Sequence, residues 1–309
     1  MKNILITGVA GFIGSNLADY LLKYGHKIIG IDDLSYGLLE QVSSQVEFHK
    51  ISILNKNIYT MFNNVDIVFH LAAKNCISDC QSDPFNTVKI NVLGTVNVFE
   101  ASKKSNVKKV IYAESSAVYE GASSFPSLEK DESPESFYAQ SKMAIKLFAD
   151  AYRSYANLNL IALRYFNVYG PRQDCRRTIP PLMCAIIINL LKGQSPILYG
   201  DGSKRRDFIY IDDVNRFHEL LINHDSILNG TYNLGVGKNY SVMEIYKTIS
   251  KLLDSDIKPE FQPDLPGETF QNLADISSAR KLGWEPKINL ENGLKLSIDY
   301  IRNNVMTTI

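Results

Sequence analysis

The chain has 309 residues, which suggests roughly two domains, and 33 Lys and Arg balance 33 Asp and Glu. Its composition, 45% hydrophobic and 21% charged, is that of a globular protein with a sizeable core. The charge balance gives no electrostatic basis for binding nucleic acid or an anionic membrane surface.

Apolar runs alternate with helical patterns through the first half of the chain. Strands buried on both faces are predicted at 3–8, 26–32, 65–73, 108–115 and 159–167, with helices at 13–24, 86–104 and 138–155. This alternation predicts an α/β fold with a doubly wound parallel sheet of Rossmann type.

The rhythm loosens from about residue 170, where glycine and proline punctuation increases. We predict a Rossmann domain over 1–166 and a smaller α/β substrate domain over 167–207 and 238–309. The strand-like runs 208–214 and 231–237 return to the main sheet or edge it, so segment 208–237 is assigned to the first domain.

Among the four cysteines, Cys76 and Cys80 could lie on one helical face, but no second ligand pair has metal-site spacing, so we predict free buried thiols, no bound metal and a reducing compartment. The longest apolar run, 182–191, is too short to span a bilayer. The glycine-rich N-terminal run lacks the features of a cleaved signal. We expect a cytoplasmic protein.

A glycine-rich turn follows the first predicted strand directly. Gly8, Gly11 and Gly14 stand where backbone N–H groups can approach a pyrophosphate at a helix N-terminus. The second strand ends in Asp32, at the distance along the chain expected of the acid that binds the ribose hydroxyls. Asp32 and Asp33, with no adjacent Arg, predict NAD rather than NADP.

The stretch "SFYAQSK" puts Tyr138 and Lys142 one helical turn apart, on one face of a helix. An ammonium beside a phenol favours the phenolate and lowers the pKa of the tyrosine. Tyr138 could then act as a general base. On its own the motif also fits a surface tyrosine and a solvated lysine.

Motifs along the whole chain resemble those of the extended short-chain dehydrogenase/reductase superfamily, within it the nucleotide-sugar epimerases and dehydratases. They are "TGVAGFIG" (7–14), "HLAA" (70–73), "NVLGT" (91–95), "ESSAVY" (114–119), "YAQSK" (138–142), "RYFNVYGPRQ" (164–173), "GDGSKRRDFIYIDDV" (200–214) and "NLGVG" (233–237). The resemblance is greatest to the UDP-hexose 4-epimerases. It implies a bound NAD, a UDP-sugar substrate and a homodimer.

The resemblance implies roles position by position. Tyr138 matches the catalytic base, Lys142 the residue that holds the nicotinamide ribose, and Ser115 the hydroxyl that hydrogen-bonds the sugar O4. The remaining NAD-binding positions that it implies are Phe12, Ile13, Leu71, Ala72, Ala73 and Asn91, the last lying behind the site. The substrate-binding positions are Ser115, Ser116, Asn167, Arg206, Glu268 and Asn272.

Three positions depart from the family pattern. Ser52 replaces an Asp that contacts adenine, and Leu265 replaces an Arg on the diphosphate, for which Arg176, Arg177 or Arg280 could compensate. Glu114 replaces a small residue just before the catalytic Ser. Its side chain either points away from the site or adds a carboxylate to it.

Residues 116 and 117 separate the rival activities. Dehydratases resembling this family carry Asp-Glu at these positions, and decarboxylases usually keep the Glu; here they are Ser116 and Ala117. An epimerase needs no such acid, so a 4-epimerase is favoured over a 4,6-dehydratase. A silent NAD-sensing protein on the same fold is a further alternative.

Two expectations concern the sugar and the assembly. Asn272 matches the position beside the sugar C2 substituent, where a small residue would admit N-acetylated sugars; it could equally cap a turn. Helices 86–104 and 138–155 carry apolar residues at helical spacing, among them Val92, Val96, Phe99, Ile145, Phe148 and Tyr152. The resemblance implies that these helices pair in a homodimer; the alternative is that all of these residues face the sheet.

Overall fold

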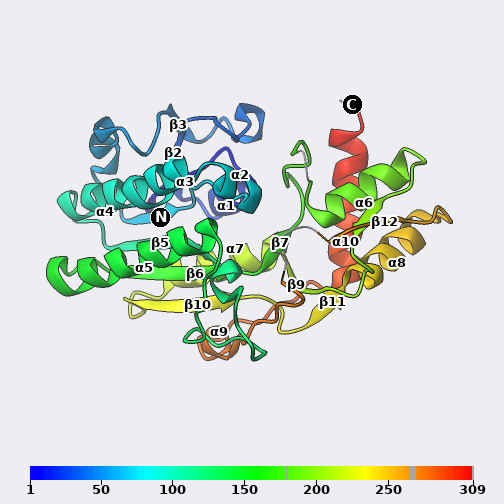
Figure 1. Ribbon diagram of the computed structural model, residues 1–309. Coiled ribbons are helices and arrows are strands. Elements are labelled where there is room, and N and C mark those ends of the chain that lie inside the picture. The colour runs from blue at the N-terminus through cyan, green and yellow to red at the C-terminus, as the bar shows by residue number, and fades with distance from the viewer. Residues whose placement is uncertain (178–179, 265–268, 308–309) are drawn as a thin grey trace. The chain divides into compact units, whose positions relative to one another are not determined.

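The computed structural model describes residues 1–177, 180–264 and 269–307. They form two compact units (Figure 1). The first comprises Met1–Ala122, Glu129–Tyr165 and Asn215–Asn233, and the second Ser123–Leu128, Phe166–Val214 and Leu234–Ile309. Segment 208–237, predicted to belong whole to the first domain, is therefore divided between the two units.

A seven-stranded sheet forms the centre of the first unit, in the order β10-β6-β5-β4-β1-β2-β3. Its strands are β1 (Asn3–Thr7), β2 (Lys27–Asp32), β3 (Glu47–Lys50), β4 (Ile67–His70), β5 (Lys109–Ser115), β6 (Leu160–Tyr165) and β10 (Gly230–Leu234). The pairings from β6 to β3 are parallel. This confirms the doubly wound sheet, whose strand order reverses between β1 and β4, where such sheets bind ligands.

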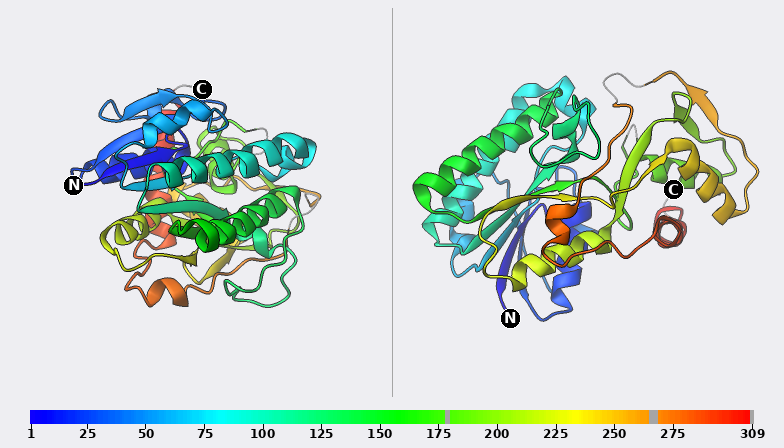
Figure 2. Two further views of the ribbon diagram at one scale, coloured as in Figure 1. Left: turned by 90° about the vertical axis from the view of Figure 1, so that its left-hand side faces the viewer. Right: turned by 90° about the horizontal axis from the view of Figure 1, so that it is seen from below.

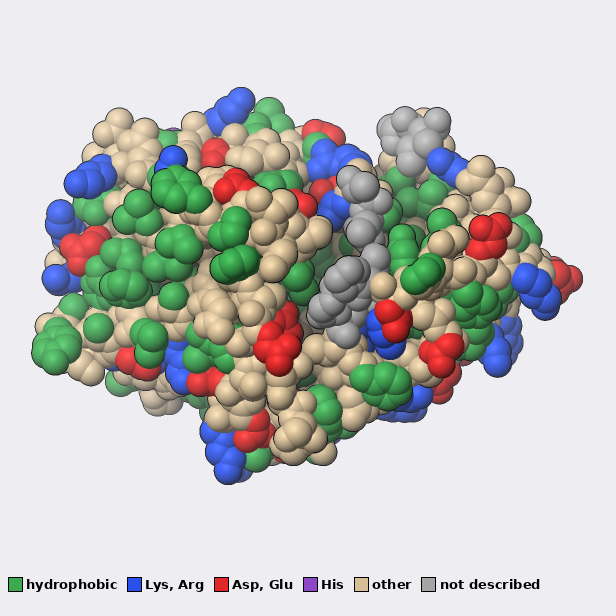
Figure 3. Space-filling view, viewed as in Figure 1, with side chains coloured by type: hydrophobic (Ala, Val, Ile, Leu, Met, Phe, Trp, Pro, Cys, Tyr) green, Lys and Arg blue, Asp and Glu red, His purple; other side chains and the backbone are tan. Residues whose placement is uncertain are grey.

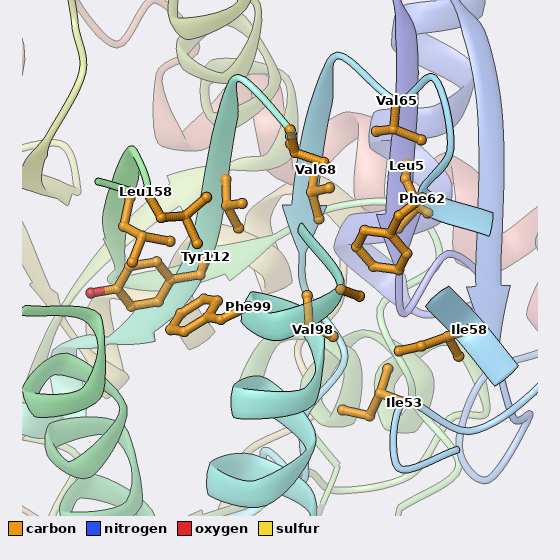
Figure 4. Close-up of a cluster of buried hydrophobic side chains, with 14 of the residues drawn as sticks. Leu5, Ile53, Ile58, Phe62, Val65, Val68, Val98, Phe99, Tyr112 and Leu158 are labelled. Carbon is orange, nitrogen blue, oxygen red and sulfur yellow. The ribbon is translucent and has the colours of Figure 1, made fainter. Parts of the chain in front are cut away.

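Helices cover both faces of this sheet, as the right-hand view of Figure 2 shows. On one face lie α4 (Thr95–Lys104) and α5 (Phe137–Ala156), and on the other α1 (Phe12–Leu22) and α7 (Ile211–Asn223). Phe62, Val68, Phe99 and Tyr112 belong to the apolar core between α4, α5 and the strands (Figure 4). Burial on both faces explains why these strands read as continuous apolar runs.

Two details of the first unit differ from the prediction. Strand β3 was not predicted, because its residues are half-buried or exposed and lack an apolar run. The helix predicted at 86–104 consists of α3 (Pro84–Thr87), a π-helical segment η3 (Val88–Gly94) and α4. π-Helical turns within helices are frequent at functional sites.

The second unit contains two small sheets. The three-stranded sheet has the order β11-β9-β7 and the two-stranded sheet pairs β12 with β8. Their strands are β7 (Asn167–Tyr169), β8 (Ile197–Tyr199), β9 (Arg205–Tyr210), β11 (Asn239–Ser241) and β12 (Glu260–Gln262). Because β9 pairs with β7 and β11, run 208–214 does not join the main sheet, whereas β10 does and lies at its edge.

The remaining helices are short or belong to the second unit. They are α2 (Ile77–Ser82), α6 (Leu182–Leu191), α8 (Val242–Leu253), α9 (Ser277–Arg280), α10 (Leu290–Tyr300), η1 (Leu39–Gln41), η2 (Lys56–Phe62), η4 (Ser116–Tyr119) and η5 (Ile301–Val305). No helix within the described residues has the length and hydropathy needed to cross a membrane.

Candidate active site

The glycine-rich turn between β1 and α1 is built from close backbone approaches. A Cβ on Gly14 would lie 2.1 Å from the carbonyl oxygen of Gly8, and Gly8 itself adopts a positive φ of 75°. Gly11 is the N-cap of α1 and no side chain caps the helix. The first N–H groups of α1, at Phe12 and Ile13, therefore start a helix N-terminus suited to a phosphate.

The neighbouring strand end supports this turn. Leu71 N donates to Thr7 O at 3.1 Å, and Ala72 N donates to Thr7 Oγ1 at 3.2 Å. A Cβ on Gly8 would lie 2.8 Å from Ala72 N. The chain over 71–73, predicted as strand, instead leaves β4 after His70 and runs beside the glycine turn.

Asp32 closes the other side of the turn at the end of β2. Its Oδ2 accepts from Ala10 N at 3.0 Å and its Oδ1 from Leu34 N at 2.8 Å. Burial raises the pKa of this carboxyl, and the two backbone donors partly oppose the shift. Asp33 is tied to the next loop, accepting from Ser35 N at 3.0 Å.

Asn91, in the π-helical segment, links the loop after β4 to the helix that carries Tyr138. Its Oδ1 accepts from Lys74 N at 2.8 Å, and its Nδ2 donates to Lys74 O and to Ser141 Oγ, both at 3.0 Å. Ser141 Oγ in turn donates to Tyr138 O at 2.7 Å. Asn91 is fully buried, and its hydrogen bonds connect the loop after β4 to α5.

His70 is part of a second buried chain of hydrogen bonds. Its Nδ1 lies 2.7 Å from Thr7 Oγ1 and its Nε2 lies 2.8 Å from Thr95 Oγ1. Burial lowers the pKa of His70 to about 3, with a smaller contribution from Lys142. The imidazole is therefore neutral at physiological pH and its role in this chain is structural.

Tyr138 and Lys142 lie in the first turns of α5, as predicted. Ser136 caps the helix, its Oγ accepting from Ala139 N at 3.1 Å. Lys142 Nζ lies 5.8 Å from the centre of the Tyr138 ring and donates to Ala113 O at 2.9 Å. Burial lowers the pKa of Lys142 to about 8, so its ammonium is still charged at pH 7.

Ser115 ends β5 and Ser116 begins η4. Ser115 Oγ accepts from Ala117 N at 3.2 Å, which fixes the turn that carries both serines. The first unit therefore presents Ser115 from a strand end and Tyr138 and Lys142 from a helix start, and Lys142 joins the two elements through Ala113.

Glu114 points away from this group, into a buried ion pair. Its carboxylate accepts from Arg164 Nε at 2.7 Å and from Tyr112 OH at 3.2 Å, and both charged side chains are fully buried. Arg164 also contacts Glu132, from the loop that precedes α5. This decides between the two orientations that the sequence left open.

A second acid of the same region holds the helix start. Glu120 accepts from Ser136 N at 2.8 Å and from Ser136 Oγ at 2.9 Å, and so positions the N-cap of α5. Neither Arg164 nor Glu120 was identified from the sequence as part of the site. A buried arginine in a β-strand, which needs a partner, was the signal available for the first.

The second unit contains a cavity of about 280 Å³ with two cations in its wall. Its lining is Asn167, Val168, Tyr169, Gln173, Pro181, Leu182, Met183, Tyr199, Lys204, Arg206, Phe208 and Val242. Asn167 and Arg206 were predicted to bind the substrate and lie together here. Lys204 was not predicted, and it is the second cation of this lining.

Asn272 lies next to Asn167. Its Oδ1 accepts from Asp207 N at 2.8 Å and from Asn167 Nδ2 at 3.2 Å. Asp207 is buried and takes three backbone N–H donors, while burial raises its pKa to about 6. With Oδ1 engaged, the amide Nδ2 is the donor that Asn272 can offer to a ligand. Glu268, also predicted to bind substrate, lies outside the described residues.

Comparison with known proteins bears on these two groups of residues. Residues 4–235 match the model of the NAD dependent epimerase/dehydratase family. The chain belongs to this family. The match covers most of the chain, and the glycine turn and Asp32 provide a site that fits NAD; the enzyme is NAD-dependent.

Relatives and solved structures are similar over nearly the full length. A UDP-glucose 4-epimerase of Mycolicibacterium smegmatis is 32% identical, with 97% of this chain and 98% of the relative covered. A UDP-glucuronate 4-epimerase of Thermodesulfobacterium geofontis is 33% identical, with 99% and 98% covered. The UDP-N-acetylglucosamine 4-epimerase of Methanobrevibacter ruminantium M1, solved with UDP-N-acetylmuramic acid, has a TM-score of 0.94, 32% identity and coverage of 100% and 99%.

Proposed function

We propose that this enzyme inverts C4 of a UDP-hexose, with UDP-GlcNAc and UDP-GalNAc as the principal pair and UDP-Glc and UDP-Gal as a second pair. UDP-sugar 4-epimerisation is the activity that its relatives and structural neighbours share. The set Ser115, Tyr138 and Lys142 carries the proposal, because it supplies a base, its cation and a hydroxyl for the sugar O4.

The chemical step is a reversible oxidation at C4. NAD, when bound, supplies the hydride acceptor and donor for C4. Tyr138 takes the proton from the 4-hydroxyl and returns it, while Ser115 hydrogen-bonds O4 and Lys142 provides the positive charge beside the phenol ring. The 4-keto sugar turns over before reduction, and the product leaves with C4 inverted.

The side chains after Ser115 argue against dehydration. Loss of water across C5 and C6 requires an acid and a base at the sugar. Positions 116 and 117 carry Ser and Ala, Glu114 is bound to Arg164, and Glu120 is bound to Ser136. The carboxylates adjacent to Ser115 are therefore committed to structural bonds, which supports the epimerase over the 4,6-dehydratase.

We assign the cavity of the second unit to the nucleotide. Arg206 and Lys204 offer positive charge to phosphates, Asn167 offers an amide, and Tyr199 and Phe208 offer aromatic surface to a base. The size of Asn272 and its amide donor support an acetamido group at C2 of the sugar. A bulky residue at this position would restrict the pocket to unacetylated sugars.

The experiment compares wild type with Asn272→Tyr on UDP-GlcNAc, UDP-GalNAc, UDP-Glc and UDP-Gal, with products identified by NMR. We expect wild type to interconvert the acetylated pair. The variant should lose that activity by about tenfold or more and keep activity on the smaller pair, because the ring fills the space of an acetamido group. Wild type that converts UDP-Glc or UDP-glucuronate but never UDP-GlcNAc would refute the assignment of the sugar.

We further propose a homodimer that pairs α5 and the helix from α3 to α4. Apolar side chains gather on this face of the first unit (Figure 3). Phe85, Leu147 and Tyr155 are 81%, 69% and 92% exposed, and Phe148 is exposed as well. Phe99 and Ile145, expected in the interface, instead belong to the core. Light scattering at micromolar concentration should give the mass of two chains; the mass of one would contradict it.

A further inference from the structure

The resemblance implies a diphosphate-binding cation that this sequence lacks. The family pattern has an Arg where this sequence has Leu265. The three arginines that could substitute for it are paired elsewhere: Arg176 with Asp174 at 2.8 Å, Arg177 with Asp174 at 3.8 Å and Arg280 with Glu285 at 2.8 Å. None of the three lines the cavity of the second unit.

Lys204 does line that cavity, together with Arg206. Lys204 directly precedes β9 and Arg206 is the second residue of that strand, so an extended chain places their side chains on the same side. The backbone at Lys204 is fixed by Val242 N, which donates to Lys204 O at 2.9 Å. The cavity therefore has two positive groups in its wall, which suits a diphosphate.

Lys204 forms an ion pair with Asp264, and the two side chains differ in their exposure to solvent. Its Nζ lies 2.8 Å from Asp264 Oδ1, yet the lysine side chain is 10% exposed and the aspartate side chain 62% exposed. A nearly buried ammonium gains from an anionic partner, whereas a carboxylate that is mostly in water can leave at little cost. Gly200 allows the approach, since a Cβ there would lie 2.2 Å from Asp264 Oδ1.

We propose that Lys204 is the second diphosphate-binding cation of this enzyme, and that the β-phosphate of a uridine diphosphate displaces the carboxylate of Asp264 from it. Asp264 is the anion that the phosphate would replace at Lys204. The inference rests on the proposed function, in which the cavity binds the UDP moiety.

The test measures binding of UMP and UDP by titration calorimetry to the NAD-loaded enzyme and to four variants. Lys204→Met should weaken UDP by about tenfold or more, and UMP by less, because a charged hydrogen bond to the β-phosphate is lost. Lys204→Arg keeps the charge and should remain within about threefold of wild type. Lys192→Met, which removes an exposed lysine of the same unit, should change neither affinity.

Asp264→Asn distinguishes a ligand site from a structural ion pair. Displacement predicts that this variant binds UDP at least as tightly as wild type, because the competing carboxylate is gone. A structural pair predicts weaker UDP binding in Asp264→Asn, similar to that in Lys204→Met, and this result would overturn the inference. If Lys204→Met does not fold, the Asp264→Asn and Lys204→Arg results decide the question on their own.

The binding of UMP and UDP also tests the role of Lys204 separately from the proposed function. Wild type that binds UDP, with Lys204→Met binding it equally well, removes the role of Lys204 and leaves the UDP site intact. Wild type that binds neither UMP nor UDP contradicts both.

Discussion

Two ion pairs, one from each unit of the chain, hold a buried charge in opposite ways. In the first, Glu114 and Arg164 are fully buried and neutralise one another; Tyr112 OH donates to Glu114 and Arg164 donates to Tyr119 OH. In the second, Lys204 is nearly buried while its partner Asp264 is mostly in water. We call an ion pair closed when both side chains are buried and open when one of them is mostly in water. A closed pair holds the elements around it in one geometry, whereas an open pair can exchange its anion for a ligand.

This contrast matches the work that we assign to each unit. Proton transfer requires groups held within a few tenths of an ångström, so fixed contacts around Ser115, Tyr138 and Lys142 are an advantage. Nucleotide recognition requires charges that gain a partner on binding. Variants of Tyr138, Glu114 and Lys142 test whether the first unit has the fixed contacts and the catalytic role that this comparison gives it.

The largest effect is expected from Tyr138→Phe. The ring and its packing remain, but the group that accepts the proton of the 4-hydroxyl is lost, so turnover should fall by about 10² or more. NMR of the products measures turnover, and thermal unfolding checks that the fold survives. Tyr155→Phe, on the exposed face of the same helix, is the matched control. A folded Tyr138→Phe enzyme with normal turnover would remove this residue from the mechanism.

Glu114→Gln should affect stability more than chemistry. Removing one charge of a buried pair leaves Arg164 with less compensation, so the free energy of unfolding should fall by about 3 kcal/mol, as measured by urea denaturation. Turnover should change by less than about tenfold, because the carboxylate does not face the site. Glu135→Gln changes an exposed residue in the loop that precedes α5, and should leave both the free energy of unfolding and the turnover unchanged.

The opposite result is informative for the same variant. Unchanged stability together with a loss of turnover as large as that of Tyr138→Phe would make Glu114 a participant in the reaction. The closed pair of the first unit would then be an incorrect description.

The smallest effect is a pH dependence of stability at Lys142. Its pKa is about 8 in the folded chain, below its ordinary value, so the unfolded chain binds more protons above pH 8. The cost of the buried ammonium is complete below pH 8 and fades as the pH rises toward about 10.5. Lys142→Met removes this cost. The free energy of unfolding of the variant minus that of wild type should therefore be larger at pH 7 than at pH 9.5, by on the order of 2 kcal/mol.

The readout is the change with pH, since bound NAD adds its own stabilisation to wild type. Urea denaturation of both proteins across this range measures it, with Lys89→Met, an exposed lysine of the same unit, as the control. A difference between Lys142→Met and wild type that does not vary with pH would mean that Lys142 is solvated in the folded enzyme.

Much of the first unit could be predicted because its signals are local. The turn at Gly8 to Gly14 and the helix start at Tyr138 depend on residues close together in sequence. Strand β3 could not be predicted, since pairing with β2 stabilises it rather than an apolar run. The orientation of Glu114 depends on Arg164, which is distant in sequence and becomes a partner only when β5 and β6 pair.

The second unit was harder to predict for the same reason. Asn167 and Arg206 were identified through family motifs, and the structure brings both into one cavity. Lys204 belongs to the same motif as Arg206 but was not predicted, because nothing in the sequence indicates that it lies close to Asp264. Similarly, the bonds of Asn272 to Asn167 and Asp207 follow from the packing of β7 and β9, not from spacing.

The most direct test of the central claim is an NMR time course of UDP-GlcNAc in D₂O, with the purified enzyme and no added NAD. The account predicts conversion to the C4 epimer with the hydrogen at C4 retained and no deuterium entering C5. Deuterium at C5 with loss of the C6 hydroxyl would identify a dehydratase. Absence of turnover with the acetylated pair, the unacetylated pair and UDP-glucuronate alike would contradict the epimerase itself.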